Sequence, residues 1–268
     1  MKSFLKYIAI MALAILSTEA KAWVQMGHET IAALAEQNLT EKAKKATTDL
    51  LGGPLKSDCM WLNSLLKDEA TKHTITWHNL HLNTKARSTT TAEGDAIVQI
   101  ERCANILSNP SQHSREEQAT ALKAIVHLVA DMHCVHHVRI KGNTLTKGFK
   151  FTYPIGYKDK KTGKDKIAST SWKAIWKGSL FNHHKGFTPE LMAEEMEFCR
   201  ADKKAEWSKG TLREWGNEMG KLTLTLLEGM EPNTQIPLKQ INLFDTPQED
   251  CLAKAGWRLA ALLNNIYK

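Results

Sequence analysis

The sequence lacks any long apolar run after residue 22 and any fixed repeat period. A helix needs about 20 consecutive apolar residues to cross a bilayer, so no membrane span is expected beyond that point. The absence of a repeat excludes a repeat architecture. The 268 residues are 42% hydrophobic and 24% charged. These values suit one globular domain and exclude a disordered or fibrous chain.

Cysteine is scarce, and its count of five is odd. The spacings match no zinc-ribbon pattern, which excludes that kind of metal site. In an exported protein we expect up to two disulfide bridges and a buried thiol, with at least one cysteine free or paired between chains. We expect the cysteine nearest to the candidate site, Cys134, to be structural. The five are Cys59, Cys103, Cys134, Cys199 and Cys251.

The first 22 residues have the pattern of a cleavable signal peptide. Lys2 and Lys6 precede an apolar run over residues 7–16, and the segment ends at the small residue Ala22. The alternative, an uncleaved membrane anchor, is disfavoured because the run is shorter than about 20 residues. We expect cleavage after Ala22, so that Trp23 starts a secreted or periplasmic protein.

Residues 23–268 are expected to form one domain with an excess of positive charge. Without the signal peptide, 36 basic and 29 acidic residues fall to 33 and 28, which changes the net charge from +7 to +5. A positive surface suits an anionic partner such as nucleic acid or phosphorylated lipid, but many exported proteins are equally basic. Charge alone therefore does not choose between these partners.

Helical periodicity dominates the chain and predicts a mainly α fold. A first helix runs from Gly27, and a second begins at Thr40 and ends at Gly52. A short third helix carries Trp61 and Leu65. Further helices are expected over residues 92–107, 114–131, 172–181, 188–199, 211–228 and 248–267.

One segment departs from the helical pattern and predicts a small β-hairpin. Aromatic and aliphatic residues alternate with others from Phe149 to Tyr157, and a polar turn follows over residues 158–166. The turn is rich in lysine. We interpret it first as a solvated turn and second as a strand-binding patch.

The helix over residues 114–131 carries the strongest chemical signal. Its second half is apolar nearly all round, which predicts a central position, yet it includes His127 and Asp131. These two residues are four apart and share a helix face. A buried charge must be paired or bound to a metal.

His137 follows beyond the expected helix end, where the chain can turn back to the same point. The run from His127 to His137 holds four histidines in eleven residues. Imidazole and carboxylate groups are ligands that Zn²⁺ takes. We therefore predict a metal site here, with chance clustering as the alternative.

The expected mature N-terminus adds a second donor set. A free α-amine and the carbonyl oxygen of Trp23 can form a five-membered chelate once the signal peptide is removed, and His28 lies five residues further on. Taken alone, this segment reads better as a capped helix start with a packed tryptophan. The cluster around Asp131 favours the metal interpretation.

These features resemble the S1/P1 nuclease family of secreted zinc phosphodiesterases, which have a helical phospholipase C/P1 nuclease-like fold. The resemblance spans the mature chain. It rests on the order and spacing of the start 23–28, the pairs Trp61 to Asn63 and Trp77-His78, the run 127–137, Gly142-Asn143 and the ending 255–264. It implies cleavage of single-stranded DNA and RNA and removal of 3′-phosphates from nucleotides.

The resemblance also implies a set of metal ligands. Trp23 and His28 would hold one zinc ion, and His78 and His127 a second, with Asp131 bridging the two. His137 would belong to a third zinc ion. His81 is an alternative to His78, although the interval from Asn63 favours His78.

The chain departs from the family pattern at two places. Where the family has a zinc-binding aspartate that orients the attacking water, this chain has Asn63, whose amide oxygen is a poor ligand. Around Trp172, serine and Lys173 replace a histidine and an aspartate. We therefore expect two zinc ions, a third site that is weak or absent, and catalytic roles at Asp131 and Asn63.

Other candidate residues surround this expected site. Lys173 could attract phosphate in place of a cation, although a solvated lysine is the plainer interpretation. Asn143 is a candidate substrate-binding residue. His133 and His136 are either orienting groups or core residues. Tryptophans could stack on bases or simply fill the core, namely Trp61, Trp77, Trp172 and Trp176.

Three functions remain open at this point. The first is a zinc-dependent phosphodiesterase with a reduced metal cluster that acts on single-stranded nucleic acid and 3′-nucleotides, as a monomer without stable membrane insertion. The second is a related zinc phospholipase C. The third is a degenerate homologue that binds metal or nucleotide without turnover, because losing a carboxylate that activates water costs several kcal/mol.

Overall fold

The computed structural model describes residues 22–89, 94–176 and 184–268 of the chain. The fold is mainly helical, as the periodicity predicts, with two small sheets. The helices are α2 (Ala22–Gln37), α3 (Glu41–Leu51), α4 (Trp61–Leu65), α5 (Ala96–Ser108), α6 (Arg115–Met132), α8 (Pro189–Cys199), α9 (Lys204–Trp207), α10 (Leu212–Leu227), α11 (Leu238–Asn242) and α12 (Asp245–Ile266). The strands are β1 (Leu80–Leu82), β2 (Val138–Ile140), β3 (Lys150–Lys158) and β4 (Asp165–Ser171).

Local capping groups set the helix starts that the sequence predicts. Ser114 and Thr211 each form a reciprocal capping box with a glutamate three residues on. Such boxes satisfy two backbone donors that would otherwise lack partners. The helix expected from residue 92 begins later as α5, because the buried carboxylate of Asp95 caps it by accepting from Val98 N. Gly52 ends α3 at φ +74°, in the left-handed region.

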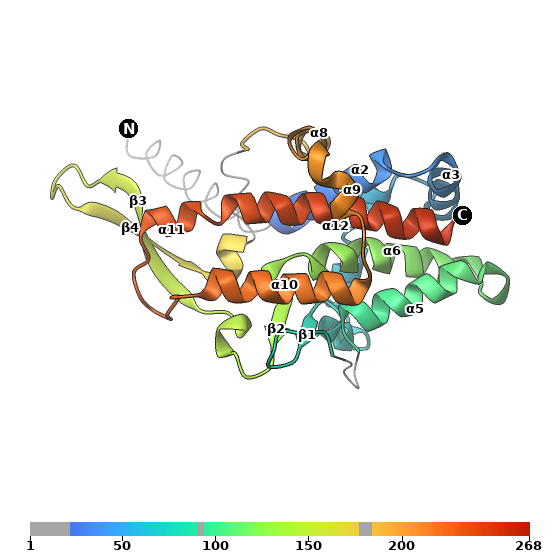
Figure 1. The fold of residues 1–268 in the computed structure, drawn as a ribbon, viewed down its shortest axis with the longest axis horizontal. Coiled ribbons are helices and arrows are strands. Elements are labelled where there is room, and N and C mark those ends of the chain that lie inside the picture. The colour runs from blue at the N-terminus through green and yellow to red at the C-terminus, as the bar shows by residue number, and fades with distance from the viewer. Residues whose placement is uncertain (1–21, 90–93, 177–183) are drawn as a thin grey trace, which may run out of the picture.

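Helices α6 and α12 form the centre of the molecule. Figure 1 shows α12 running along the length of the body, and α12 packs against α2, α6 and α8. The second half of α6 is buried from Ala121 to Met132 apart from Lys123. This confirms the central position that its apolar surface predicts, and it places the polar residues of α6 deep in the core.

A short parallel sheet, which periodicity did not predict, joins two distant segments. Strand β1 pairs with β2, with Leu80 opposite Val138 and His81 opposite Arg139. Each strand is only three residues long, so it carries no detectable alternation. The pair brings the residues just before each strand, His78 and His137, to the same end of the sheet.

The predicted hairpin is present as strands β3 and β4, and it projects from one end of the body (Figure 1). Its base is packed: Phe149 stacks on Trp172 at a ring-centroid distance of 5.8 Å. Trp172 contacts Trp176 and Phe244 edge-on. Trp172 begins a helix, which was expected over 172–181; residues 172–176 are helical, and the remainder lies outside the described residues.

The prediction of disulfide bridges is wrong for this structure. No disulfide joins any of the five cysteines in the described part of the chain, and four of them are buried at separate places along the sequence. They serve as small apolar core residues, which is a common role of free cysteine. Within the described part of the chain, no helix is both long and apolar enough to cross a membrane. The expected signal peptide falls on residues 1–22, of which 1–21 lie outside the described residues.

Candidate metal centre

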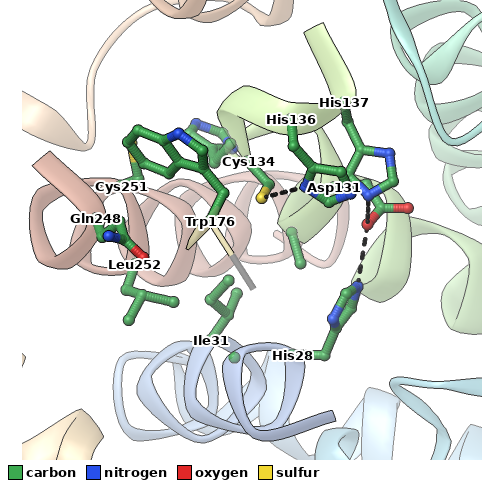
Figure 2. A pocket seen from close by; sticks show the side chains of 13 residues that line it. His28, Ile31, Asp131, Cys134, His136, His137, Trp176, Gln248, Cys251 and Leu252 are labelled. Carbon is green, nitrogen blue, oxygen red and sulfur yellow. Dashed lines mark hydrogen bonds and ion pairs between the residues drawn. The ribbon is translucent and has the colours of Figure 1, made fainter. Parts of the chain in front are cut away.

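Asp131 lies at the centre of a cluster of four histidines. One carboxylate oxygen, Oδ1, is 3.3 Å from His28 Nε2 and 3.2 Å from His137 Nε2. The other, Oδ2, is 2.6 Å from His78 Nδ1 and 3.1 Å from His127 Nε2. Figure 2 shows His28 and His137 approaching Asp131 from opposite sides. Each oxygen therefore faces two imidazoles, as expected of a carboxylate that bridges two ions.

Four segments supply these side chains. His127 and Asp131 share one face of α6, His28 comes from α2, and His78 precedes β1. His137 ends the short 3₁₀ turn η5 (Val135–His137), which turns the chain back after α6. The structure thus brings together five of the residues that the sequence predicts as ligands, although the resemblance assigned His137 to a separate third ion.

His127 is held in the tautomer that a metal ligand needs. Its Nδ1 donates to the carbonyl oxygen of Cys59 at 2.7 Å, so its Nε2 presents a lone pair to the cluster. Burial lowers the pKa of His127, and this effect exceeds the opposing influence of Asp131. The imidazole is therefore neutral. An outer hydrogen bond to a carbonyl is the usual support of a ligating histidine.

Asp131 remains a carboxylate although it is buried. Burial alone works to raise its pKa, but the neighbouring His137 and His127 outweigh burial and hold the pKa well below its ordinary value. A buried carboxylate must be paired with positive charge, which a protonated imidazole or a bound cation can supply. The buried carboxylate is therefore compatible with a bound positive ion.

The donor set fits a divalent metal. Ligand atoms of His28, His127 and Asp131 all lie within 4.8 Å of one another. His78 donates from Nδ1 to Asp131, and its buried Nε2 has no hydrogen-bond partner within the described residues. Nitrogen and carboxylate oxygen ligands in this number suit Zn²⁺.

A small cavity of about 30 Å³ adjoins the cluster. It is lined by His28, Asp131 and His137 on one side and by Trp176 and Cys251 on the other (Figure 2). This volume holds an ion or one to two water molecules, but not a nucleotide. The cavity is suited to a metal and its water.

A charged network, which sequence reasoning missed, supports the base of the site. His133 accepts a hydrogen bond from Arg258 at 3.0 Å, and Arg258 also bonds Glu218 and the carbonyl of Trp207. Burial, with Arg258 second, lowers the pKa of His133 to about 3, so it is a neutral supporting group. The only sequence signal for this network was the segment 255–264, which contains Arg258 and forms part of the family resemblance.

Next to the cluster, Cys134 Sγ lies 2.9 Å from His136 Nδ1. His136 in turn packs against His137, with ring centroids 3.8 Å apart. His136 is buried and contacts His137. It can therefore be a core residue and also orient His137.

A larger groove of about 430 Å³ lies along the β1–β2 pair. His81 lines this groove and not the cluster, so the structure places His78 rather than His81 beside Asp131. Asn143 lines the same groove, and its side chain accepts a hydrogen bond from Leu145 N. The basic residues Arg139, Lys141 and Lys147 share the groove.

Three further candidates remain. Asn63 is half-buried on α4, which packs against α6, and its side chain makes no hydrogen bond within the described residues. Lys173 is exposed and does not line the cavity. Trp23 is the second residue of α2, five positions before His28. The roles of these three residues remain predictions.

A helical body that holds four histidines around one buried carboxylate defines the class of helical proteins with a core cluster that could hold a metal ion. The family model described as S1/P1 Nuclease matches residues 23–268. The chain belongs to the S1/P1 nuclease family. This family is generally zinc-dependent, and it supports a nuclease or phosphodiesterase function in broad terms. No curated protein matches the sequence.

Proposed function

We propose that the protein is a zinc-dependent phosphodiesterase that hydrolyses single-stranded DNA or RNA and 3′-nucleotides outside the cytoplasm. The observation that carries the proposal is the approach of four imidazoles to the two oxygens of Asp131 at 2.6–3.3 Å. His28, His78, His127 and Asp131 would hold two zinc ions, with Trp23 completing the set from a processed N-terminus.

Two bound zinc ions would clamp a phosphate and lower the pKa of a shared water towards neutrality. The chain's own contribution is to position these groups before substrate arrives. Asp131 spans both halves of the cluster, Cys59 O fixes the ring of His127, and the surrounding core excludes bulk water. Fixed polar groups in a site of low dielectric constant stabilise developing charge more strongly than water does.

The groove beside β2 supports an anionic substrate. Arg139 is half-buried, and its Nη1 donates to the carbonyls of His136, Val138 and Thr146. It has no carboxylate partner within the described residues, and no acidic side chain of the described chain lines the groove. A guanidinium without a counter-ion favours phosphate binding.

A second candidate function is metal or nucleotide binding without turnover. Asn63 favours it, because an amide cannot replace the charge of the family's aspartate at this position. A related zinc phospholipase activity is a third candidate. The three candidates differ in whether a substrate is turned over and in which one. All three require Asp131 to hold the metal.

The test compares the chain starting at Trp23 with its Asp131→Asn variant. Zinc per chain is measured by atomic absorption, and hydrolysis is measured on single-stranded DNA, a 3′-nucleotide and a phospholipid. We expect about two zinc ions and nucleotide turnover in the parent chain. Asp131→Asn should lower both zinc affinity and turnover, the latter by roughly 100-fold or about 2.7 kcal/mol.

Asp202→Asn is the matched control, because Asp202 is exposed and lies outside the cluster. It should retain both zinc and turnover. Zinc without turnover on any substrate would select the degenerate homologue, and turnover of phospholipid alone would select the phospholipase. Absence of zinc in the parent chain would overturn the whole proposal.

A further inference from the structure

The tip of the β3–β4 hairpin concentrates positive charge on a projecting part of the molecule. Residues 157–167 contain five lysines and two aspartates. The hairpin extends beyond the helical body (Figure 1), and these residues are exposed apart from Asp159. The lysines are Lys158, Lys160, Lys161, Lys164 and Lys166.

The two aspartates do not neutralise this charge. Asp159 builds the turn, because its Oδ1 accepts hydrogen bonds from the backbone of Lys161 and from both the backbone and the hydroxyl of Thr162. Asp165 pairs with Lys158 only in backbone register. Within the described residues, none of the five lysines forms a salt bridge, so all remain available to an external anion.

Exposed apolar side chains flank the lysines. Tyr157 is 71% exposed and Ile167 is 46% exposed, and both lie near the tip end of their strands. The strand register breaks between Pro154 and Lys158, and Gly156 adopts φ +78° within the break. A bulge of this kind re-aims the residues beside it. It leaves the Tyr157 ring in solvent and outside the core that holds the hairpin base.

The hairpin is connected through packed side chains to the cavity beside Asp131. Segment 233–236 runs along β3, with hydrogen bonds from Asn233 N to Lys150 O and from Ile236 N to Thr152 O. The aromatic stack at the hairpin base continues through Trp172 to Trp176, which lines the cavity beside Asp131. A ligand bound at the hairpin tip would therefore be connected through Trp172 and Trp176 to the cavity beside Asp131.

We propose that this hairpin is an arm that binds a single strand of nucleic acid, with the lysines on phosphates and Tyr157 stacked against a base. The inference rests on the proposed function for its substrate class. Proteins that bind single strands combine basic side chains along the backbone with aromatic rings for the bases. Strand β3 has nine residues, which corresponds to about 30 Å and exceeds the length of a mononucleotide, so the arm acts on polymers alone.

The experiment uses the full mature chain and a fluorescent 20-residue oligothymidylate, with anisotropy measured over a range of salt concentrations. The arm variant carries Lys160→Ala, Lys161→Ala and Lys164→Ala. The control carries Lys67→Ala, Lys85→Ala and Lys221→Ala, which remove the same charge from exposed positions elsewhere. Zinc is removed with a chelator during binding, so that hydrolysis does not consume the probe, and circular dichroism checks that each chelated variant remains folded.

We expect the arm variant to bind the oligonucleotide at least about 10-fold more weakly, with a salt slope smaller by about 2, because three phosphate contacts on single-stranded DNA are lost. Tyr157→Ala should weaken binding roughly 5-fold or more without changing the salt slope. The control should change neither quantity beyond the small effect of net charge. In zinc-loaded enzyme, KM for the oligonucleotide should rise while turnover of a 3′-nucleotide stays unchanged.

Equal affinities of the arm variant and the control would overturn the arm, even if the enzyme is active. Binding of the parent to anionic phospholipid vesicles, but not to the oligonucleotide, would also overturn it. If the parent chain hydrolyses no substrate but the arm variant still loses oligonucleotide binding, the result would support the arm and reject the proposed catalytic function. The two proposals therefore fail independently.

Discussion

At the scale of single residues, Asn63 is the departure from the family pattern for which we expect the largest effect on catalysis. It stands where the family pattern has an aspartate, and it lies half-buried on α4 beside the helix that carries Asp131. An amide oxygen is a weaker ligand than a carboxylate and carries no charge to balance the metal. The substitution is therefore expected to weaken one ion and the water that it binds.

Asn63→Asp should restore the missing charge. We expect tighter zinc binding and turnover of single-stranded DNA that increases by roughly 10-fold, which corresponds to about 1.4 kcal/mol of transition-state stabilisation. Zinc titration and initial rates measure the two effects. Ser64→Asp is the matched control, because it adds the same charge at the neighbouring exposed residue. An equal increase in zinc affinity and turnover in both variants would show that position 63 has no specific role in the site.

The cysteines give a second prediction at this scale. Burial raises the pKa of Cys59 and Cys251 to about 12 and that of Cys103 to about 11, which leaves these thiols unreactive at neutral pH. Cys199 is exposed. Ellman's reagent should therefore react quickly with one thiol in the native protein and with five in denaturant.

The serine variant of the exposed cysteine, Cys199→Ser, supplies the control for that measurement. It should show no fast-reacting thiol in the native state and four in denaturant. Fewer than five accessible thiols in the unfolded parent chain would contradict the absence of disulfides among the described residues and restore the disulfide prediction.

At the scale of elements, close approach between α12 and α2 holds the site together. Gly256 of α12 lies against Leu34 of α2, and a Cβ at position 256 would meet three Leu34 side-chain atoms at 2.6–2.8 Å. Leu34 is fully buried, so it cannot move aside into solvent. The helix that carries His28 therefore depends on the absence of a side chain at this position.

Gly256→Ala should destabilise the protein. Overpacking of a core costs about 1–3 kcal/mol, whereas the better helix propensity of alanine returns about 1 kcal/mol. We expect a net loss of roughly 1 kcal/mol, measured as a lower denaturant midpoint in urea unfolding. Gly53→Ala is the control, because a Cβ at position 53 would lie 4.0 Å from Ser57 Oγ, its nearest neighbour. A midpoint unchanged by Gly256→Ala would show that the two helices can separate without penalty.

At the scale of the whole molecule, metal binding at this cluster would be coupled to folding. The cluster joins segments that lie as far apart in sequence as His28 and His137, and it brings them to one buried carboxylate. A site of this kind does not exist in the unfolded chain, so metal affinity adds to folding stability. Removing the metal is therefore expected to loosen the entire body and not one loop.

Zinc at 100 times its Kd should stabilise the chain by about 2.7 kcal/mol. For a protein of this size, that corresponds to a Tm increase of roughly 5–10 °C. Differential scanning calorimetry with zinc and with chelator measures the shift. Asp131→Asn should show little response to either. A chelator-insensitive Tm in a parent chain that contains zinc would contradict the coupling of the cluster to the fold.

Local chemistry in the sequence determined the helices, the hairpin and the segment from His127 to His137. Capping at Ser114 and Thr211 and the apolar surface of α6 depend on residues a few positions apart, so a linear reading detects them. Spacing along one helix was also enough to place His127 beside Asp131.

Only the tertiary structure showed which residues from other parts of the chain contact the segment from His127 to His137. The approach of His28 and His78 to Asp131, the pairing of β1 with β2, and the support of His133 by Arg258 all link residues far apart in sequence. Such contacts depend on packing of the whole chain, and three-residue strands leave no periodic signal. The resemblance to a family indicated the candidate ligands in advance. The disulfide bridges were mispredicted, because the number of cysteines does not show which sulfur atoms lie close together.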